Sequence, residues 1–327
     1  MSTETGKKIA EEEKLRAKGE GAPHVTAKLR LFGASEDDVK VTFYRDHAAW
    51  CPYCQKVWMM LEEKKIPYRI ERINMRSYGD KPAWFLKKVP SGLLPVLELD
   101  GKMITESLVI MQILEQTFPE IPMIPEEHFD RANTLLRLER QLFSDWCGLV
   151  FRPSGPGPFG GGARKQFEET FDKVNEALGE LPGPWFLGGD TPSIVDLQYV
   201  SHVERMNASC LYWKGLQLRS TERWANVERW FAAFEERPCY MATKSDYYTH
   251  VMDIPPQYGP GYGDSSEAAK QAQLNIDGLS TWRLPLNLSP SDAEPLPDSM
   301  NHGDEAARHE AAYKLVSNYD AIVKFCC

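Results

Sequence analysis

Residues 50–54 read Trp50-Cys51-Pro52-Tyr53-Cys54 and stand between a predicted strand and a predicted helix. Apolar and polar side chains alternate over residues 39–44, which predicts the strand, and residues 52–62 are typical of a helix that begins at Pro52. Cys51 is therefore expected at the N-cap of this helix. Unpaired N–H groups and the positive end of the helix dipole stabilise a thiolate there, so Cys51 is predicted to be a nucleophile.

A Cys-x-x-Cys pair has two other common uses, a structural zinc site and a permanent disulfide. The zinc site needs a second pair of Cys or His residues at ligand spacing, and Cys147, Cys210 and Cys239 stand alone in the sequence. We therefore expect no metal. The seven cysteines are odd in number and lack framework spacing, which indicates a reducing compartment. In such a compartment Cys51 and Cys54 are expected to cycle between thiol and disulfide.

The composition excludes several classes of protein. A length of 327 residues predicts about two domains, and 42% hydrophobic residues can fill two cores. The net charge of −9 leaves no basic excess for a phosphate backbone, so no nucleic-acid partner is expected. The sequence has no apolar run long enough to span a bilayer, no secretory signal and no clear transit peptide. We predict a cytoplasmic or plastid-stroma protein without stable membrane insertion, as a monomer or homodimer.

The first part of the chain predicts a βαβαββα order after a charged N-terminal arm at residues 1–38. Beyond the first strand and helix, the predicted elements are a strand at 67–73, a short helix at 81–88, a hairpin with an Asp-Gly turn at 94–104, and a helix at 108–118. A helix that joins two neighbouring strands makes those strands parallel. The first two strands are therefore expected to be parallel.

The second part of the chain is predicted to be helical after a proline-rich linker at 119–125. The expected elements are a helix at 131–150, a glycine-rich connection at 155–162, a helix at 167–178, a helix that opens with a capping box at Ser193–Asp196, and a helix at 223–237 that Pro238 ends. From residue 251 the proline and glycine content predicts an extended segment. A last helix at 304–325 carries an apolar stripe, including Leu315, Tyr319 and Ile322, that is expected to dock.

Several residues are suited to a peptide-like thiol that has a free α-amino group and a free α-carboxylate. Pro95 precedes a predicted strand, and a cis bond after Leu94 would turn the Leu94 backbone toward a peptide. Glu106 could bind the ammonium group, and Ser107 with the helix N-terminus could bind the carboxylate. A plain helix cap is the alternative for Glu106 and Ser107. Glutathione meets each requirement of the first interpretation.

The chain resembles a cysteine-type glutathione S-transferase of the omega, lambda and dehydroascorbate reductase classes. Cys51-Pro52-Tyr53-Cys54 matches the glutaredoxin site, Lys81-Pro82-x-Trp84-Phe85 through Pro95-Val96-Leu97 resembles the omega segment, and Thr105-Glu106-Ser107 matches the γ-glutamyl-binding turn. The chain is most similar to the iota class of photosynthetic organisms. The resemblance implies an α/β plus all-α fold. It comprises a thioredoxin-like domain at 39–120, a helical domain at 126–250, and a C-terminal extension at 251–327.

The resemblance also implies roles for individual residues. Cys51 would be the nucleophile and Cys54 a second catalytic cysteine that resolves a mixed disulfide. The residues implied to bind glutathione, the co-substrate, are Lys81, Leu94, Pro95, Glu106 and Ser107. The predicted activity is reduction of a glutathionylated substrate or of dehydroascorbate through a mixed disulfide on Cys51. Conjugation of glutathione to electrophiles, or non-catalytic carriage of a hydrophobic ligand such as a tetrapyrrole, are the alternatives.

Overall fold

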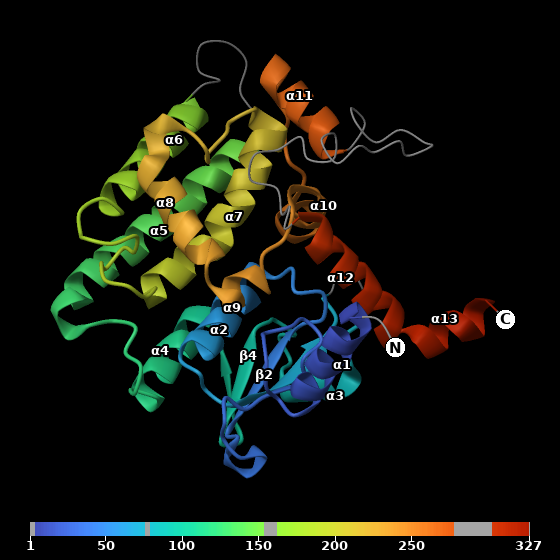
Figure 1. The fold of residues 1–327 in the computed structure, drawn as a ribbon. Coiled ribbons are helices and arrows are strands. Elements are labelled where there is room, and N and C mark those ends of the chain that lie inside the picture. The colour runs from blue at the N-terminus through green and yellow to red at the C-terminus, as the bar shows by residue number, and fades with distance from the viewer. Residues whose placement is uncertain (1–3, 76–78, 154–161, 278–302, 327) are drawn as a thin grey trace.

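A computed structural model describes residues 4–75, 79–153, 162–277 and 303–326. Figure 1 shows a sheet with flanking helices, built mainly from the first 120 residues, beside a bundle of helices. Helix α2 (Pro52–Glu63) contacts both α4 (Ser107–Thr117) of the sheet part and α7 (Ile194–Lys214) of the bundle. One hydrophobic core therefore runs from the sheet through α2 into the bundle.

The sheet has five strands in the order β1-β3-β2-β4-β5. Their bounds are β1 Leu29–Arg30, β2 Val41–Asp46, β3 Tyr68–Ile73, β4 Val96–Leu99 and β5 Lys102–Thr105. Strands β2 and β3 are parallel, as predicted, whereas β4 is antiparallel to both β2 and β5. With α2, α3 (Ala83–Lys88) and α4, this confirms the predicted βαβαββα order.

The turn of the β4–β5 hairpin has the predicted chemistry. Asp100 and Gly101 both have positive φ, 48° and 79°. Positive φ at both central residues is the geometry that joins two twisted strands with a two-residue loop, and Asp-Gly adopts it at low cost.

The N-terminal segment is more ordered than the predicted arm. Residues Glu4–Ala17 form helix α1, and β1 adds to the sheet edge beside β3. Arg30 of β1 is buried and donates two hydrogen bonds of 2.8 Å to the carboxylate of Glu62. A two-residue strand is too short to show a period in the sequence, so the pairing partner determines it.

The helical part contains α5 (Phe129–Val150), α6 (Gly162–Ala177), α7, α8 (Ala225–Glu235) and the short α9 (Pro238–Met241). The predicted capping box of α7 is confirmed, since Asp196 accepts from Ser193 N at 2.8 Å. Asp196 also accepts from Phe186 N at 3.0 Å and from Trp230 Nε1 at 2.9 Å. Asp196 therefore ties three segments of the bundle together.

The predicted helix at 223–237 is too long at both ends. A 3-10 turn occupies Glu222–Trp224, and α8 ends at Glu235. Pro238 begins α9 instead of terminating its predecessor. Proline is suited to a first helical position because the N–H that it lacks would have no partner there.

The extended segment predicted from residue 251 is wrong for residues 251–258 and 267–276, which are helical, while residues 278–302 of that segment lie outside the described residues. Helix α10 (Tyr247–Tyr258) crosses residue 251, and α11 (Glu267–Ile276) contacts α7. Asp246 caps α10 by accepting from Thr249 N at 2.8 Å. Pro255 and Pro256 lie in the last four residues of α10. The proline content misled the prediction because proline is tolerated near the end of a helix that packing stabilises.

The predicted terminal helix consists of two helices, α12 (Gly303–Ser317) and α13 (Tyr319–Cys326). Helix α12 lies beside α1 (Figure 1). The expected apolar stripe is not docked, because Leu315 and Tyr319 are 60% and 64% exposed. The buried contact is Tyr313, whose ring lies 5.0 Å from that of His24. Among the described helices, none is long and apolar enough to cross a bilayer.

Candidate functional site

Cys51 occupies the predicted N-cap of α2, directly after the loop that leaves β2. Two contacts hold this loop: Trp50 N donates to Asp46 Oδ2 at 2.6 Å, and Arg205 of α7 donates to Trp50 O at 2.5 Å. The Cys51 side chain makes no capping hydrogen bond and is 7% exposed. The thiol therefore stands at the helix N-terminus without serving as its cap.

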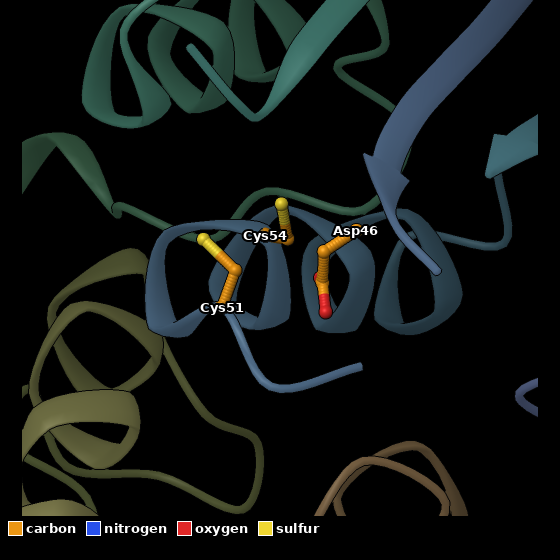
Figure 2. Close-up of side chains that lie close together, drawn as sticks. All are labelled: Asp46, Cys51 and Cys54. Carbon is orange, nitrogen blue, oxygen red and sulfur yellow. The ribbon is translucent and has the colours of Figure 1, made fainter. Parts of the chain in front are cut away.

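Cys54 lies one turn further along α2 and is 1% exposed. Burial, a hydrogen bond and an electrostatic interaction with Cys51, and the nearby Asp46 carboxylate raise the pKa of Cys54 well above that of a free thiol. Cys54 therefore keeps its proton and can donate it in a hydrogen bond to the Cys51 sulfur. Figure 2 shows Asp46, Cys51 and Cys54 grouped at the start of α2, both cysteines being free.

The sheet topology brings the predicted glutathione residues to the edge where Cys51 lies. Because β4 is antiparallel to β2, Pro95 at the start of β4 adjoins the end of β2, where Tyr44 pairs with Val96. Thr105 pairs with Val96 in turn, so Glu106 follows at the same edge. The Leu94–Pro95 peptide bond is cis, which meets the condition under which the Leu94 backbone was expected to turn toward a peptide.

The side chains at this edge have different environments. Glu106 is exposed at the N-cap of α4 with a φ of 68°, and Ser107 is the buried first residue of that helix. Lys81 is half-buried and donates to Asn74 O at 2.8 Å. Burial lowers the pKa of Lys81, and the groups of Cys54 and Cys51 oppose this change. Lys81 is thus close enough to the cysteine pair to interact with it electrostatically.

The sequence interpretation missed a buried polar cluster behind Cys51, formed by Lys56, Glu139 and His202. Lys56 comes from α2, Glu139 from α5 and His202 from α7, and each is at most 2% exposed. His202 Nδ1 donates to Glu139 Oε1 at 2.7 Å. Within the described residues, Lys56 Nζ, Glu139 Oε2 and His202 Nε2 have no hydrogen-bond partner.

Burial determines the ionisation of this cluster. It lowers the pKa of Lys56 to about 8 and, with the Lys56 charge, that of His202 to about 4. Burial opposes the charge of Glu139, but the hydrogen bond with His202 and the Lys56 charge leave its pKa below the ordinary value. Near pH 7 the cluster therefore holds an ammonium, a carboxylate and a neutral imidazole.

Aromatic side chains connect this cluster to the cysteine pair. Tyr53 lies between Cys51 and Cys54 in sequence, and its ring is 5.3 Å from that of His202 and 5.0 Å from Lys56 Nζ. The ring of Phe143 lies 4.8 Å from that of His202, and the ring of Tyr258 in α10 lies 5.9 Å from that of Phe143. The last turn of α10 thus joins the surroundings of the site, which the predicted extended segment did not anticipate.

Only weak signals in the sequence could have identified the missed residues. Asp46 ends the first long strand five positions before Cys51, and Lys56 directly precedes the apolar run 57–61 of α2. A charged residue in an apolar helix usually faces solvent, and only the position of the bundle shows that Lys56 does not.

A thioredoxin-like sheet followed by a helical bundle, with a cysteine at the start of the helix that follows strand β2, defines a class of two-domain thiol proteins. This chain belongs to the glutathione S-transferase family. Residues 50–117 match the model of the family's N-terminal domain, and residues 126–233 match that of its C-terminal domain. The family implies glutathione as co-substrate. Helices α9 to α13 lie entirely beyond the matched residues.

Comparison with individual proteins shows which classes of the family this chain is related to. Mouse glutathione S-transferase omega-1 is 30% identical over 208 residues, 62% of this chain and 80% of that protein. Glutathione S-transferase DHAR2 of Arabidopsis thaliana is 28% identical over 195 residues, 60% of this chain and 84% of that protein. The chain is thus a cysteine-type member related to the omega, dehydroascorbate reductase and lambda classes at about 30% identity.

Solved structures share the fold. The dehydroascorbate reductase of Chlamydomonas reinhardtii has a TM-score of 0.52 at 23% identity, and the match covers 66% of this chain and 98% of that one. Glutathione transferase Omega 3C of Trametes versicolor has a TM-score of 0.53 at 24% identity, with 74% and 95% covered.

Proposed function

We propose that this protein is a glutathione-dependent thiol transferase that reduces glutathionylated substrates, or dehydroascorbate, through a mixed disulfide on Cys51. The observation that carries the proposal is the free cysteine at the N-terminus of α2, at the sheet edge where the cis Pro95 and Glu106 also lie. A cysteine at this position can form a disulfide with glutathione. The related omega and DHAR proteins support the same chemistry.

In the proposed cycle, the Cys51 thiolate attacks the glutathione sulfur of a glutathionylated substrate. The Cys51–glutathione bond forms, the substrate–sulfur bond breaks, and the substrate thiolate takes a proton from solvent. A second glutathione thiolate then attacks the glutathione sulfur of the mixed disulfide, which releases oxidised glutathione and restores Cys51. Alternatively, Cys54 loses its proton and attacks the Cys51 sulfur, which releases glutathione and forms a Cys51–Cys54 disulfide. Two further glutathione molecules then reduce this disulfide to the two thiols and leave as oxidised glutathione.

The proposed glutathione contacts follow from the chemistry of each group. Glu106 binds the ammonium of the γ-glutamyl group, and Ser107 with the α4 N-terminus binds its carboxylate. The backbone of Leu94, ahead of Pro95, pairs with the peptide main chain, and Lys81 binds the second carboxylate. We also propose membership of the iota class. For location we propose the cytoplasm or plastid stroma, in keeping with relatives named cytosolic and chloroplastic.

The test is a coupled assay in which glutathione reductase and NADPH report disulfide reduction. Cys51→Ser should abolish reduction, and Cys147→Ser, which changes a cysteine on α5 remote in sequence from the site, should retain it. Mass spectrometry after treatment with oxidised glutathione should show an adduct on Cys51 or a Cys51–Cys54 disulfide. Full reduction by Cys51→Ser would refute the proposal. Aryl halide conjugation that survives this change would favour the conjugating alternative, and ligand binding without turnover would favour the carrier.

A further inference from the structure

The cysteine pair has a third neighbour that the proposed thiol cycle does not use. Asp46 is the last residue of β2 and is 0% exposed. One carboxylate oxygen of Asp46 and the sulfurs of Cys51 and Cys54 all lie within 4.8 Å of one another (Figure 2). Two sulfurs and one carboxylate oxygen, supplied by a strand end and one helical turn, thus meet at one buried point.

Only one of the two carboxylate oxygens of Asp46 has a hydrogen-bond partner among the described groups. Its Oδ2 accepts from Trp50 N at 2.6 Å, but its Oδ1 has no hydrogen-bond partner among the described groups. Buried carboxylate oxygens are normally paired, because an unpaired one has lost its hydration without compensation. The free oxygen is therefore an independent sign that this side chain lacks a ligand.

We propose that Asp46, Cys51 and Cys54 bind one thiophilic divalent ion of the zinc or cadmium type. Thiolates and a carboxylate are ligands that such ions accept. Three protein ligands leave a fourth tetrahedral position for water or an added thiol, as in zinc sites that are not purely structural. Two sulfurs that bind one zinc ion tetrahedrally, with Zn–S bonds of about 2.3 Å, lie ~3.8 Å apart. The three ligand atoms here lie within 4.8 Å of one another, so side-chain rotations that shorten their separations by about 1 Å would complete the site.

The charges around the site suit a bound cation with thiolate ligands. On binding, each thiol releases its proton to solvent, and two thiolates, a carboxylate and a divalent ion together carry a charge of about −1. Arg45 interacts electrostatically with Asp46 and Cys54, and Lys81 interacts with all three ligands. These two cations offset the remaining negative charge. The sequence excluded a structural zinc site because it lacks a second pair of Cys or His ligands. The three ligands proposed here need no such pair, because the carboxylate of Asp46 is the third.

A bound ion would occupy the sulfur that the proposed cycle needs, so it would act as a reversible inhibitor. The binding itself can be measured without any turnover. Its failure is therefore distinguishable from failure of the proposed function.

The experiment titrates Cd²⁺ and Zn²⁺ into the reduced, chelator-treated full chain. Ultraviolet thiolate-to-cadmium charge-transfer absorption and calorimetry are the readouts. We expect one ion per chain with thiolate absorption, loss of binding in Cys54→Ser, and affinity at least about tenfold weaker in Asp46→Asn, the scale of losing a group that supports a metal site. Cys147→Ser and Cys239→Ser are matched controls and should bind as the wild type does.

Two further measurements keep the test independent of folding defects. Wild type oxidised to the Cys51–Cys54 disulfide should not bind, and reduction should restore binding without any substitution. Circular dichroism should show that Asp46→Asn is folded. Absence of thiolate absorption in the reduced wild type would overturn the proposal, as would equal affinity in a folded Asp46→Asn variant.

Discussion

Replacement of Lys56 by methionine should stabilise the protein at neutral pH. Lys56 is fully buried, and its pKa is lowered from 10.5 to about 8, mainly by burial. A difference of about 2.5 pKa units, at about 1.36 kcal/mol each, means that the buried ammonium costs the fold roughly 3 kcal/mol when it is charged. Methionine has a similar length and no charge, so Lys56→Met should raise the free energy of unfolding at pH 7 by up to about 3 kcal/mol.

The sign of the pH dependence follows from the same shift. Because the folded-state pKa lies below the unfolded-state value, the destabilisation is fully present below about pH 8. It disappears as the pH rises from the folded pKa toward the unfolded value of about 10.5. The advantage of Lys56→Met should therefore shrink steadily across this range.

The assay is urea unfolding of wild type and Lys56→Met at pH 7 and at about pH 10. Lys87→Met is the matched control, since Lys87 is exposed on α3 and its replacement should change stability little. Lys56→Met should also slow alkylation of Cys51 by iodoacetamide, because a positive charge near the thiolate is lost. Two results would refute this reasoning. One is a Lys56→Met variant no more stable than wild type at pH 7, and the other is a difference in free energy of unfolding that is as large at about pH 10 as at pH 7.

Glu139→Gln should lower the free energy of unfolding in urea by roughly 1–3 kcal/mol, because it removes the charged acceptor of the buried His202 hydrogen bond and the carboxylate charge that offsets buried Lys56; an unchanged midpoint would contradict this. Glu106→Gln should weaken glutathione binding by about tenfold or more in calorimetry, from the ~1.5–3 kcal/mol of a hydrogen bond to a charged group. Exposed Glu120→Gln is its control, and equal affinity of the two variants would count against the contact. Asp196→Ala should cost about 3 kcal/mol or more, since it removes bonds to Ser193, Phe186 and Trp230, with kcat unchanged in the protein that remains folded.

Local patterns were sufficient for the sheet part of the fold. The alternation at 39–44, the Asp-Gly turn and the helix at Pro52 each act within a few residues, and the structure has all three. The order of strands and helices then constrains the topology, because a right-handed crossover leaves few arrangements. The N-cap position of Cys51 followed from the same local reasoning.

Patterns failed where packing outweighs local preference. Pro255 and Pro256 predicted an extended chain, yet they lie inside α10, which packs on α7. The stripe at Leu315 and Tyr319 predicted a docked helix, but α12 contacts α1 through Tyr313 instead. In both cases the partner surface determines the outcome, and that surface is formed by residues far away in the sequence.

The sequence by itself determined that a cysteine stands at a helix start, with a proline before a later strand and an acidic residue before a later helix. These features depend on neighbours along the chain. Only the tertiary structure brought Lys56 to Glu139 and His202, and left Asp46 Oδ1 buried and unpaired beside Cys51 and Cys54. Burial is a property of the whole fold, and burial governs both the pKa of Lys56 and the unmet need of Asp46 for a partner.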